Sequence, residues 1–530
     1  MRSVTRRLML FFNILAALAI FVGGCTGEGS GTPQPTSTTE GEPKFGGELR
    51  TYWQTAFSYL DPQRSTAGAD PFFSKLYTAT LLDYAEDGSL LPYLAQSWSL
   101  PDAKTIVLKL RSDVKFHDGT AFDSAAVKFN IERGQAAETN TPVRSTYTQI
   151  EQVETPDPLT VILRLKSPDG GFAYNLATTS SVGIGGMVSP TAVQKWGKEF
   201  ERHVVAAGPF EIEKYTPEVE LVLKRNESFF MKDAQGKKLP YLDRVRFTII
   251  PDATVAGAAL ESEQVDLARV IAQAQADRLK NNKSVTVSTL KGNALIFLSP
   301  FTPKPPLDNL DLRKAIAYAI DRDEIVRAEY GGHAQPAYTA FPSSMWAWDS
   351  TIQDYKYDPA KAKEHLVKAG YPNGIKLTAA AFKSTAGLGI DTVQAQLKRV
   401  GIDLTVDEME MVTFQEKFRK NGEYDLGFAA TPSSVDPSTL ASKQYASGAF
   451  YNPGQPKVPE FDALIEKGRL ATDRNERKKI YSDLQKAINA RVHSIPLLYL
   501  ASFSAYQTYV KGYTWGPELI GDIRWAWLDK

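Results

Sequence analysis

The chain has 530 residues, enough for about three domains, and 43% of them are hydrophobic, which excludes a largely disordered protein. Its 61 Lys and Arg residues balance 61 Asp and Glu residues, so there is no overall positive field to hold nucleic acid, and no concentrated basic stripe replaces it. Because Cys25 is the only cysteine, an intramolecular disulfide and a zinc or iron–sulfur site built on cysteines are excluded.

The beginning of the chain has the pattern of a bacterial secretion signal. Three arginines precede an apolar run over 8–22, which is short for a membrane-spanning helix and fits a signal-peptide core. Two glycines then lead to Cys25, and this string resembles a lipobox, in which the cysteine thiol is acylated. We therefore predict a signal peptide over 1–24 and a lipid on Cys25. The alternative is an ordinary secretory signal with an incidental cysteine.

The segment after Cys25 is composed almost entirely of Gly, Ser, Thr, Pro and Glu. Such a segment cannot bury enough apolar surface to offset its ordering entropy, so we predict a flexible, lipid-anchored linker over 25–45. No later stretch contains 18 consecutive apolar residues. We expect the folded body to work outside the cytoplasmic membrane, in a periplasm or on the outer face of the cell membrane.

Strand and helix patterns alternate along the body, which predicts a mixed α/β fold. The longest periodic segment, 311–330, reads as one helix that ends at a pair of glycines. The other helices are expected over 123–133, 252–263, 359–369, 388–400, 459–470 and 474–491. Strands are expected over 46–53, 105–110, 160–165, 220–224, 245–250 and 402–406, and from 496 onward.

No motif of the body identifies an active site. The glycine-rich string over 183–186 lacks the full dinucleotide-binding pattern, and no P-loop or nucleophile elbow is present. The five histidines are scattered, and His117 stands in a context typical of a turn. We therefore expect no catalysis, no cofactor and no metal site.

Several strings of the body, read together and in order, resemble the signature segments of the family 5 extracellular solute-binding proteins of ABC importers. Each string alone is moderately specific, but their order along the chain is the order found in the family. The resemblance extends from about residue 46 to the end of the chain. The strings lie at 91–98, 110–120, 207–210, 225–230, 311–322, 357–372, 396–402 and 422–426.

The resemblance implies a two-lobed, periplasmic-binding-protein-like α/β fold (type II, cluster C) with an extra inserted domain. In this family the two lobes close on the ligand like a hinge. The lobe that contains both ends of the body would be discontinuous, and the inserted domain would pack beside it. The domains expected here are lobe I over 46–81, 207–295 and 492–530, the inserted domain over 82–206, and lobe II over 296–491.

Peptide-binding members carry a segment similar to WxADYxDP, whose first Asp binds the peptide amine by a charge-assisted hydrogen bond. The matching stretch here is 428–437, and alignment on Asp436 places Ser433 at the amine-binding position. A serine cannot neutralise an ammonium group, so a peptide ligand would require either that a neighbour such as Asp436 replaces the missing charge or that the loop is shifted by several residues. The candidate ligand-binding residues of this stretch are Phe428, Thr431, Ser433, Ser434 and Asp436.

Three tryptophans are further candidates for the ligand site. Trp53 follows the first strand, and Trp346 and Trp348 lie between the two most recognisable helical segments. Aromatic platforms beside neutral hydroxyls are typical of sugar sites, whereas packing in the core or near the hinge is the ordinary alternative for each tryptophan.

The resemblance implies a substrate-binding lipoprotein that captures a peptide or similar polar organic solute and delivers it to an ABC permease and its ATPase. An oligosaccharide is the alternative ligand, because Ser433 and the tryptophans suit a sugar. A secreted lipoprotein hydrolase and a sensor that presents its ligand to a signalling partner are more distant alternatives. We expect a monomer that contacts the membrane through its N-terminal lipid and binds no nucleic acid.

Overall fold

A computed structural model describes residues 41–54, 59–64, 70–179, 183–383, 389–432, 435–516 and 521–530. The predicted signal peptide, Cys25 and most of the predicted linker lie outside these ranges. Within them, no helix combines the length and the apolar character that crossing a membrane requires.

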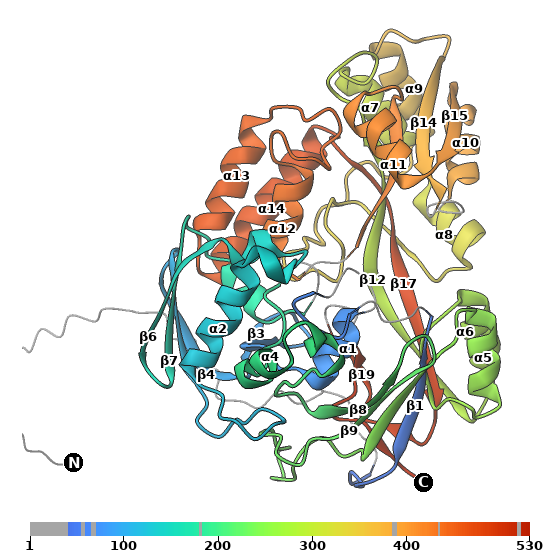
Figure 1. Cartoon of the computed structure of the whole chain (residues 1–530). Helices are drawn as coiled ribbons and strands as arrows, with labels where there is room; N and C mark the ends of the chain where they lie inside the picture. Colours follow the sequence, from blue (N-terminus) through green and yellow to red (C-terminus); the bar gives the residue numbers. More distant parts are fainter. Residues whose placement is uncertain are drawn as a thin grey trace, which may run out of the picture.

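The fold is mixed α/β, as predicted, and is organised around one large sheet that extends through both lobes (Figure 1). Within the described ranges it has 11 strands in the order β15-β14-β16-β12-β17-β11-β1-β10-β9-β8, and β13 pairs with β17 off this path. The strands are β1 (Glu48–Trp53), β8 (Phe210–Thr216), β9 (Glu220–Arg225), β10 (Arg244–Ile249), β11 (Leu267–Ile271), β12 (Val285–Pro300), β13 (Gln335–Pro336), β14 (Ile375–Phe382), β15 (Ile402–Met409), β16 (Leu426–Pro432) and β17 (Ile495–Gln507).

Two long antiparallel strands, β12 and β17, connect the lobes (Figure 1). One end of β17 pairs with β11, and the other end pairs with β13. The register between β12 and β17 shifts between Lys291 and Ala294, opposite Leu500 and Ala501. The bulge contains Gly292 at φ +74°, a left-handed conformation that favours glycine. We call the part around β1 and β8–β11 the first lobe and the part around β13–β16 the second lobe.

Helices cover both lobes. In the first lobe these are α1 (Asp70–Tyr77), α5 (Ala253–Glu261) and α6 (Gln273–Leu279). The second lobe carries α7 (Leu310–Ala319), α8 (Arg322–Tyr330), α9 (Pro359–Lys368), α10 (Ile390–Arg399), α11 (Met411–Phe414), α12 (Pro437–Gln444), α13 (Pro459–Leu470) and α14 (Arg474–Ala490). The apolar faces of α7–α10 pack on β14–β16 in one continuous core of buried Leu, Ile, Val and Ala side chains.

The prediction of a single helix over 311–330 is wrong. Ile320 has extended backbone angles, so α7 ends there, and Asp321 begins α8 by accepting a hydrogen bond from the amide of Glu324 at 3.0 Å. Gln396 stabilises the break between α7 and α8, because its side-chain oxygen accepts a hydrogen bond from the amide of Asp321 at 3.1 Å. The apolar period continues through the break, which explains why the pattern did not reveal it.

A separate four-stranded sheet, β4-β5-β7-β6, belongs to the segment that follows α1. The sheet consists of two similar hairpins, β4–β5 and β6–β7. The first strands of the hairpins, β4 and β6, have the same pattern of buried and exposed residues, and so do the second strands, β5 and β7. The strands are β4 (Ala95–Asp102), β5 (Thr105–Leu110), β6 (Ile150–Asp157) and β7 (Thr160–Leu165). Beside them lie the hairpin of β2 (Leu82–Tyr84) with β3 (Leu90–Pro92) and the helices α2 (Ser124–Gln135), α3 (Arg144–Tyr147) and α4 (Pro190–Trp196). The residue boundaries expected for the lobes and the inserted domain stay a prediction.

The two ends of the described body are held together on the first lobe. Lys44 forms an ion pair with Asp529 at 2.6 Å, and Gly47 lies against Leu528. The last strand, β21 (Trp527–Leu528), pairs with β18 (Val510–Lys511), and the neighbouring pair is β19 (Thr514–Trp515) with β20 (Gly521–Asp522). The segment that enters β1 is therefore fixed against the C-terminus.

Candidate functional site

The strand directions identify the space in which a ligand would lie. β17 runs from the second lobe into the first and pairs antiparallel with β11, so the carboxyl end of β11, opposite Phe503, is the end nearer the second lobe. β12 runs the other way, so the carboxyl end of β16, where Pro432 is opposite Ala294, is the end nearer the first lobe. β1 is parallel to β11, and β14 is parallel to β16. The carboxyl ends of both sets of parallel strands therefore face each other, and these are the ends at which α/β sheets bind ligands.

On the first lobe this edge carries Trp53 and Arg269. The half-buried Trp53 ends β1, and Phe73 packs edge-on against its ring, with the ring centroids 4.7 Å apart. The guanidinium of Arg269, on β11, lies 4.4 Å from the centroid of the Trp53 ring. Burial lowers the pKa of Arg269, so its positive charge sits where water stabilises it poorly.

The sequence pattern did not identify Arg269 as a candidate for the ligand site. The only available signal was a single arginine inside the apolar strand 267–271, a position that also suits an exposed face. Arg269 becomes a candidate only in the folded chain, where β1 pairs with β11. This pairing sets Thr51 opposite Leu267 and therefore places Arg269 beside Trp53.

On the second lobe, Asp436 and Trp346 meet around one buried arginine, Arg477. Its guanidinium pairs with Asp436 at 2.8 and 2.9 Å and donates to the hydroxyl of Ser438 at 2.6 Å. The ring of Trp346 lies 5.5 Å from this guanidinium and stacks with an interplanar angle of 16° on Tyr174, which belongs to the segment after β7 and not to the second lobe. We call these five residues the Arg477 cluster. Asp436 also caps α12, so its charge and its oxygens are engaged within the protein.

Trp348 and Thr431 lie near the connecting strands. The indole nitrogen of Trp348 donates to the hydroxyl of Tyr499, on β17, at 3.1 Å. Thr431 is buried, and its hydroxyl accepts a hydrogen bond from the side chain of Gln444. Thr431 shares a face of β16 with Ala429, which packs in the same apolar cluster as Tyr499, with Trp348 against it.

Phe428 has a different environment from the one expected of a ligand-binding residue. Its side chain is fully buried in the core of the second lobe, among residues of β14 and the helices α7–α10. It therefore presents no surface to the space between the lobes in this structure. Ser433 and Ser434 lie outside the described residues. The proposed role of this segment in ligand binding stays a prediction.

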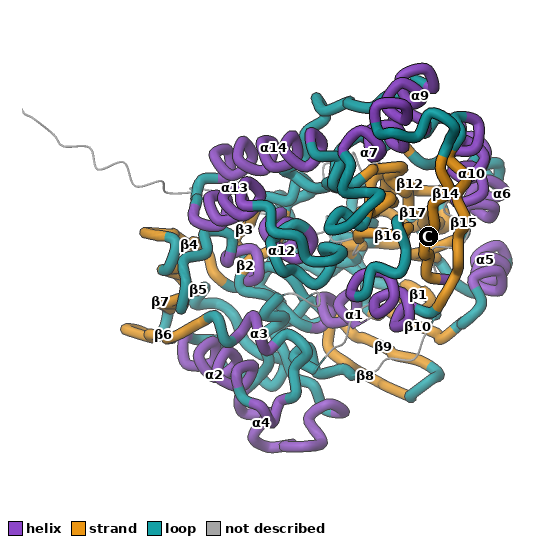
Figure 2. The backbone as a smooth tube through the Cα atoms, turned by 90° about the horizontal axis from the view of Figure 1, so that it is seen from above, coloured by secondary structure: helices purple, strands orange, loops and turns teal. Residues whose placement is uncertain are grey.

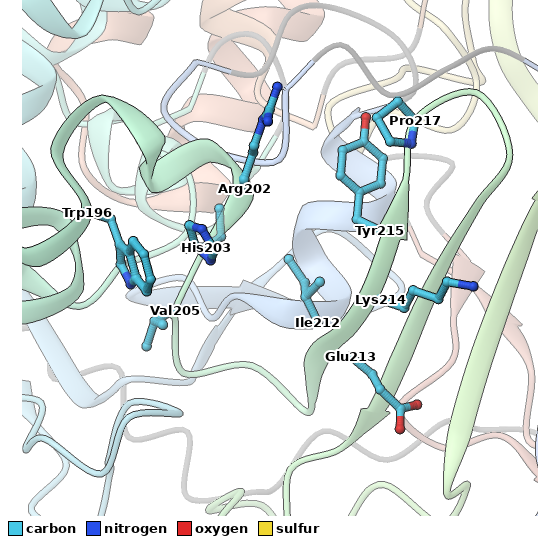
Figure 3. A pocket seen from close by; sticks show the side chains of 10 residues that line it. Trp196, Arg202, His203, Val205, Ile212, Glu213, Lys214, Tyr215 and Pro217 are labelled. Carbon is cyan, nitrogen blue, oxygen red and sulfur yellow. The ribbon is translucent and has the colours of Figure 1, made fainter.

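A cavity of about 540 Å³ lies away from this space, between the edge strand β8 and the segment around α4 (Figure 3). The rings of Trp196 and His203 stack at one end of the cavity, with their centroids 3.7 Å apart (Figure 3). Glu213, Lys214 and Tyr215 line its β8 side (Figure 3). Two of its charges are already balanced, because Glu213 pairs with Arg244 and Lys214 pairs with Glu220. Nothing in its lining belongs to the second lobe.

The described part of the chain contains no group of three or more His, Cys, Asp or Glu side chains arranged to hold a metal ion. The buried histidine His493 hydrogen-bonds Asn452 at 2.9 Å. His117 lies against the carbonyl of Gly208 at 3.1 Å.

Comparisons with known proteins agree with the geometry. Residues 89–452 match the family model described as bacterial extracellular solute-binding proteins, family 5, middle. The glutathione-binding protein GsiB of Pectobacterium atrosepticum is 29% identical over 460 residues, covering 84% of this chain and 87% of that protein.

Two solved structures are similar over nearly the whole chain. The periplasmic binding protein DppA of Helicobacter pylori, in complex with the peptide STSA, has a TM-score of 0.71 and 25% identity and covers 92% of this chain and 99% of its own. The ABC transporter substrate-binding protein CtaP of Listeria monocytogenes has a TM-score of 0.80 and 24% identity and covers 92% of this chain and 100% of its own.

Proposed function

We propose that this chain, which belongs to the bacterial extracellular solute-binding proteins of family 5, captures a short peptide between its two lobes. As a member of this family, it is the substrate-binding component of an ABC importer and hands its solute to the membrane permease. The observation that carries the choice of ligand is the similarity over most of the chain to a protein named for glutathione and to one solved with the peptide STSA. Both ligands are short peptides that carry an amine and at least one free carboxylate.

The first lobe supports this choice. Arg269, whose guanidinium lies 4.4 Å from the centroid of the Trp53 ring at this edge, is our candidate partner for a peptide carboxylate, because guanidinium and carboxylate groups pair well. The half-buried ring of Trp53 lies at the same edge, with Phe73 and Arg269 against it. On the second lobe, the carboxylate of Asp436 is already paired with Arg477, so the peptide amine requires other partners there.

Native mass spectrometry of the 26–530 body, followed by denaturation to release any bound solute, identifies the ligand class directly. Peptide masses would support the proposal. Masses built of hexose or pentose units would replace it with the oligosaccharide receptor. If the protein is empty, isothermal titration with glutathione, STSA and maltotriose makes the same distinction, and binding of maltotriose alone would refute the peptide.

The role of Arg269 is tested with a matched pair of variants. R269Q should weaken STSA binding at least 10-fold, because a charge-assisted pair contributes about 1.5–3 kcal/mol. R278Q is the control, since Arg278 is an exposed arginine that pairs with Glu261 at 3.1 Å on the outer helices. STSA with an amidated C-terminus should bind the native protein and R269Q with similar, weak affinity. A full loss of binding in the control, or equal binding of both peptides by the native protein, would contradict this role.

We also propose that Cys25 is acylated and that the protein is a membrane-anchored monomer without catalytic activity. The sequence around Cys25 supports the anchor. Replacing Cys25 by Ser should release the protein from the membrane fraction, and continued retention would refute acylation. Recovery of an unchanged ligand after prolonged incubation would agree with binding alone, whereas a cleaved product would indicate a hydrolase.

A further inference from the structure

The segment that carries β2–β7, which shares a buried core with Trp525 and Trp527 of the first lobe, touches the second lobe at a place away from the connecting strands. The loop between β2 and β3 and the segment after β7 reach α13 and α14 of the second lobe. Figure 2 shows β2 and β3 beside α13. Arg474, at the start of α14, pairs with the carboxylate of Asp87 at 3.0 Å and donates to its carbonyl at 2.6 Å. The guanidinium of Arg474 also lies over Trp346, 5.1 Å from the ring centroid.

Two adjacent glycines allow the surfaces to approach closely: Gly170 meets the backbone of the second lobe, and Gly171 meets the side chain of Arg477. The amide of Gly170 donates to the carbonyl of Arg469 at 2.7 Å, and the side chain of Arg469 donates to the carbonyl of Pro168. A Cβ atom on Gly170 would lie 2.1 Å from the carbonyl oxygen of Ala471, and one on Gly171 would lie 2.5 Å from the guanidinium of Arg477. No side chain can be accommodated at either position while the two surfaces are in contact.

An acidic residue, Asp169, lies partly buried within this contact. Its carboxylate accepts from the amide of Gly171 at 3.0 Å, and its own amide donates to Ala103 at 2.6 Å. The charged groups of the second lobe that face it are Asp436, Arg477 on α14 and Arg469 on α13. Burial, followed by the neighbouring charge of Asp436, raises the pKa of Asp169 to about 6, despite the two arginines.

We propose that this contact is a latch, which forms when the lobes close, separates when they open, and holds more tightly in mildly acidic medium. The connecting strands lie apart from it, so rotation about them separates these surfaces (Figure 1). The latch rests on the proposed function, because it acts on the same closure that encloses the solute.

The direction of the pH effect follows from the protonation of Asp169. The carboxyl has a pKa of about 6 within the contact, and an ordinary aspartate has a pKa of about 3.9 when the surfaces are apart. The contact therefore loses stability as the pH rises through 6, because closing then confines a negative charge beside Asp436. Lowering the pH from 7.5 to 5.5 should increase the ratio of closed to open molecules about 4-fold.

Distances between two spin labels measure the latch without any ligand. The 26–530 body contains no cysteine, so labels can be placed at Lys104→Cys, beside the Asp169 segment, and Lys467→Cys, on α13. Both lysines are exposed. The population at the short distance should rise about 4-fold relative to the long one between pH 7.5 and pH 5.5.

Three variants make the test specific. D169N should show the low-pH population at both pH values, whereas D403N, at an exposed aspartate of β15, should behave as the native protein does. G170A should lower the short-distance population at both pH values, and its far-UV circular dichroism shows whether it is folded. Equal distances at both pH values in the native body, or a pH response that survives D169N, would overturn the latch.

Titration with STSA separates this inference from the proposed function. Tighter STSA binding at pH 5.5 than at pH 7.5, with the difference lost in D169N, supports both. A pH-dependent distance without STSA binding leaves the latch standing and removes this peptide as ligand. STSA binding with no pH dependence in either protein leaves the peptide standing and overturns the latch.

Discussion

Replacing Arg477 by Met should strongly destabilise the second lobe. The Arg477 side chain is 1% exposed and that of Asp436 is 9% exposed, so the variant leaves a buried carboxylate without its cation. The arginine also donates to Ser438 at 2.6 Å and to the carbonyl of Gly468 at 3.2 Å. Removing one partner of such a buried pair costs about 3–5 kcal/mol, and we expect a loss in this range in the free energy of unfolding.

A second variant distinguishes the uncompensated charge from lost packing. Asn is as good an N-cap residue as Asp, so D436N keeps the cap of α12 while it removes the charge. The R477M/D436N double variant should therefore be more stable than R477M alone by at least about 2 kcal/mol. R491M is the control, because Arg491 forms an exposed ion pair with Glu460 at 3.0 Å, and such a pair contributes at most about 1 kcal/mol.

Urea unfolding at pH 7, followed by tryptophan fluorescence and far-UV circular dichroism, measures these differences. The fluorescence reports on the cluster directly, since Trp346 lies against Arg477. Unfolding of R477M within about 1 kcal/mol of the native protein would contradict a large cost for the unpaired carboxylate of Asp436. A double variant no more stable than R477M would contradict it as well.

Three further predictions concern the connecting strands, acid stability and the tryptophans. Gly292→Val should lower the free energy of unfolding by at least about 2 kcal/mol. The reason is that the φ angle of Gly292 is +74° and that a Cβ atom there would lie 1.9 Å from the hydroxyl oxygen of Ser343. An unchanged midpoint of urea unfolding would contradict this prediction. Burial lowers the pKa of His493 to about 4, so the folded state keeps this ring neutral and loses stability as the pH falls below the unfolded value of about 6.5. Between pH 7.5 and pH 5 this loss is about 2 kcal/mol, and H493Q should be less sensitive to acid by that amount in urea unfolding. Truncating Trp346 or Trp348 to Ala should weaken STSA binding by at least about 1 kcal/mol if the side chain is an interface anchor, and unchanged affinity in calorimetry would leave it a packing residue.

Local patterns predicted the short, regular elements well. The strands β5 and β7 and the helix α13 have the predicted bounds, because their periodicity and turn signals all point to one structure. The strand β12 was not predicted. The string Lys291-Gly292-Asn293 reads as a turn, but here it is a bulge that the pairing with β17 keeps within one continuous strand.

The candidate site could be predicted only in part, since its geometry depends on contacts distant in sequence. Trp346 and Asp436 were identified as single residues, yet Arg477, which brings them together, follows Asp436 by 41 positions and looks like one basic residue among several on α14. The latch joins residues about 300 positions apart, and no local pattern records such a contact. The Trp53–Arg269 pair likewise depends on strand order.

The attachment of the N-terminal segment to the C-terminus makes the two lobes mechanically unequal. Because Lys44 is bound to Asp529 and Gly47 lies against Leu528, any pull on the chain before residue 41 is transmitted to the first lobe alone. The second lobe is joined to that lobe through internal segments, so it can swing while the attachment point stays still. If the proposed lipid on Cys25 holds the chain to a membrane, the first lobe stays fixed at that membrane, and only the second lobe has to reorient when the lobes open or close.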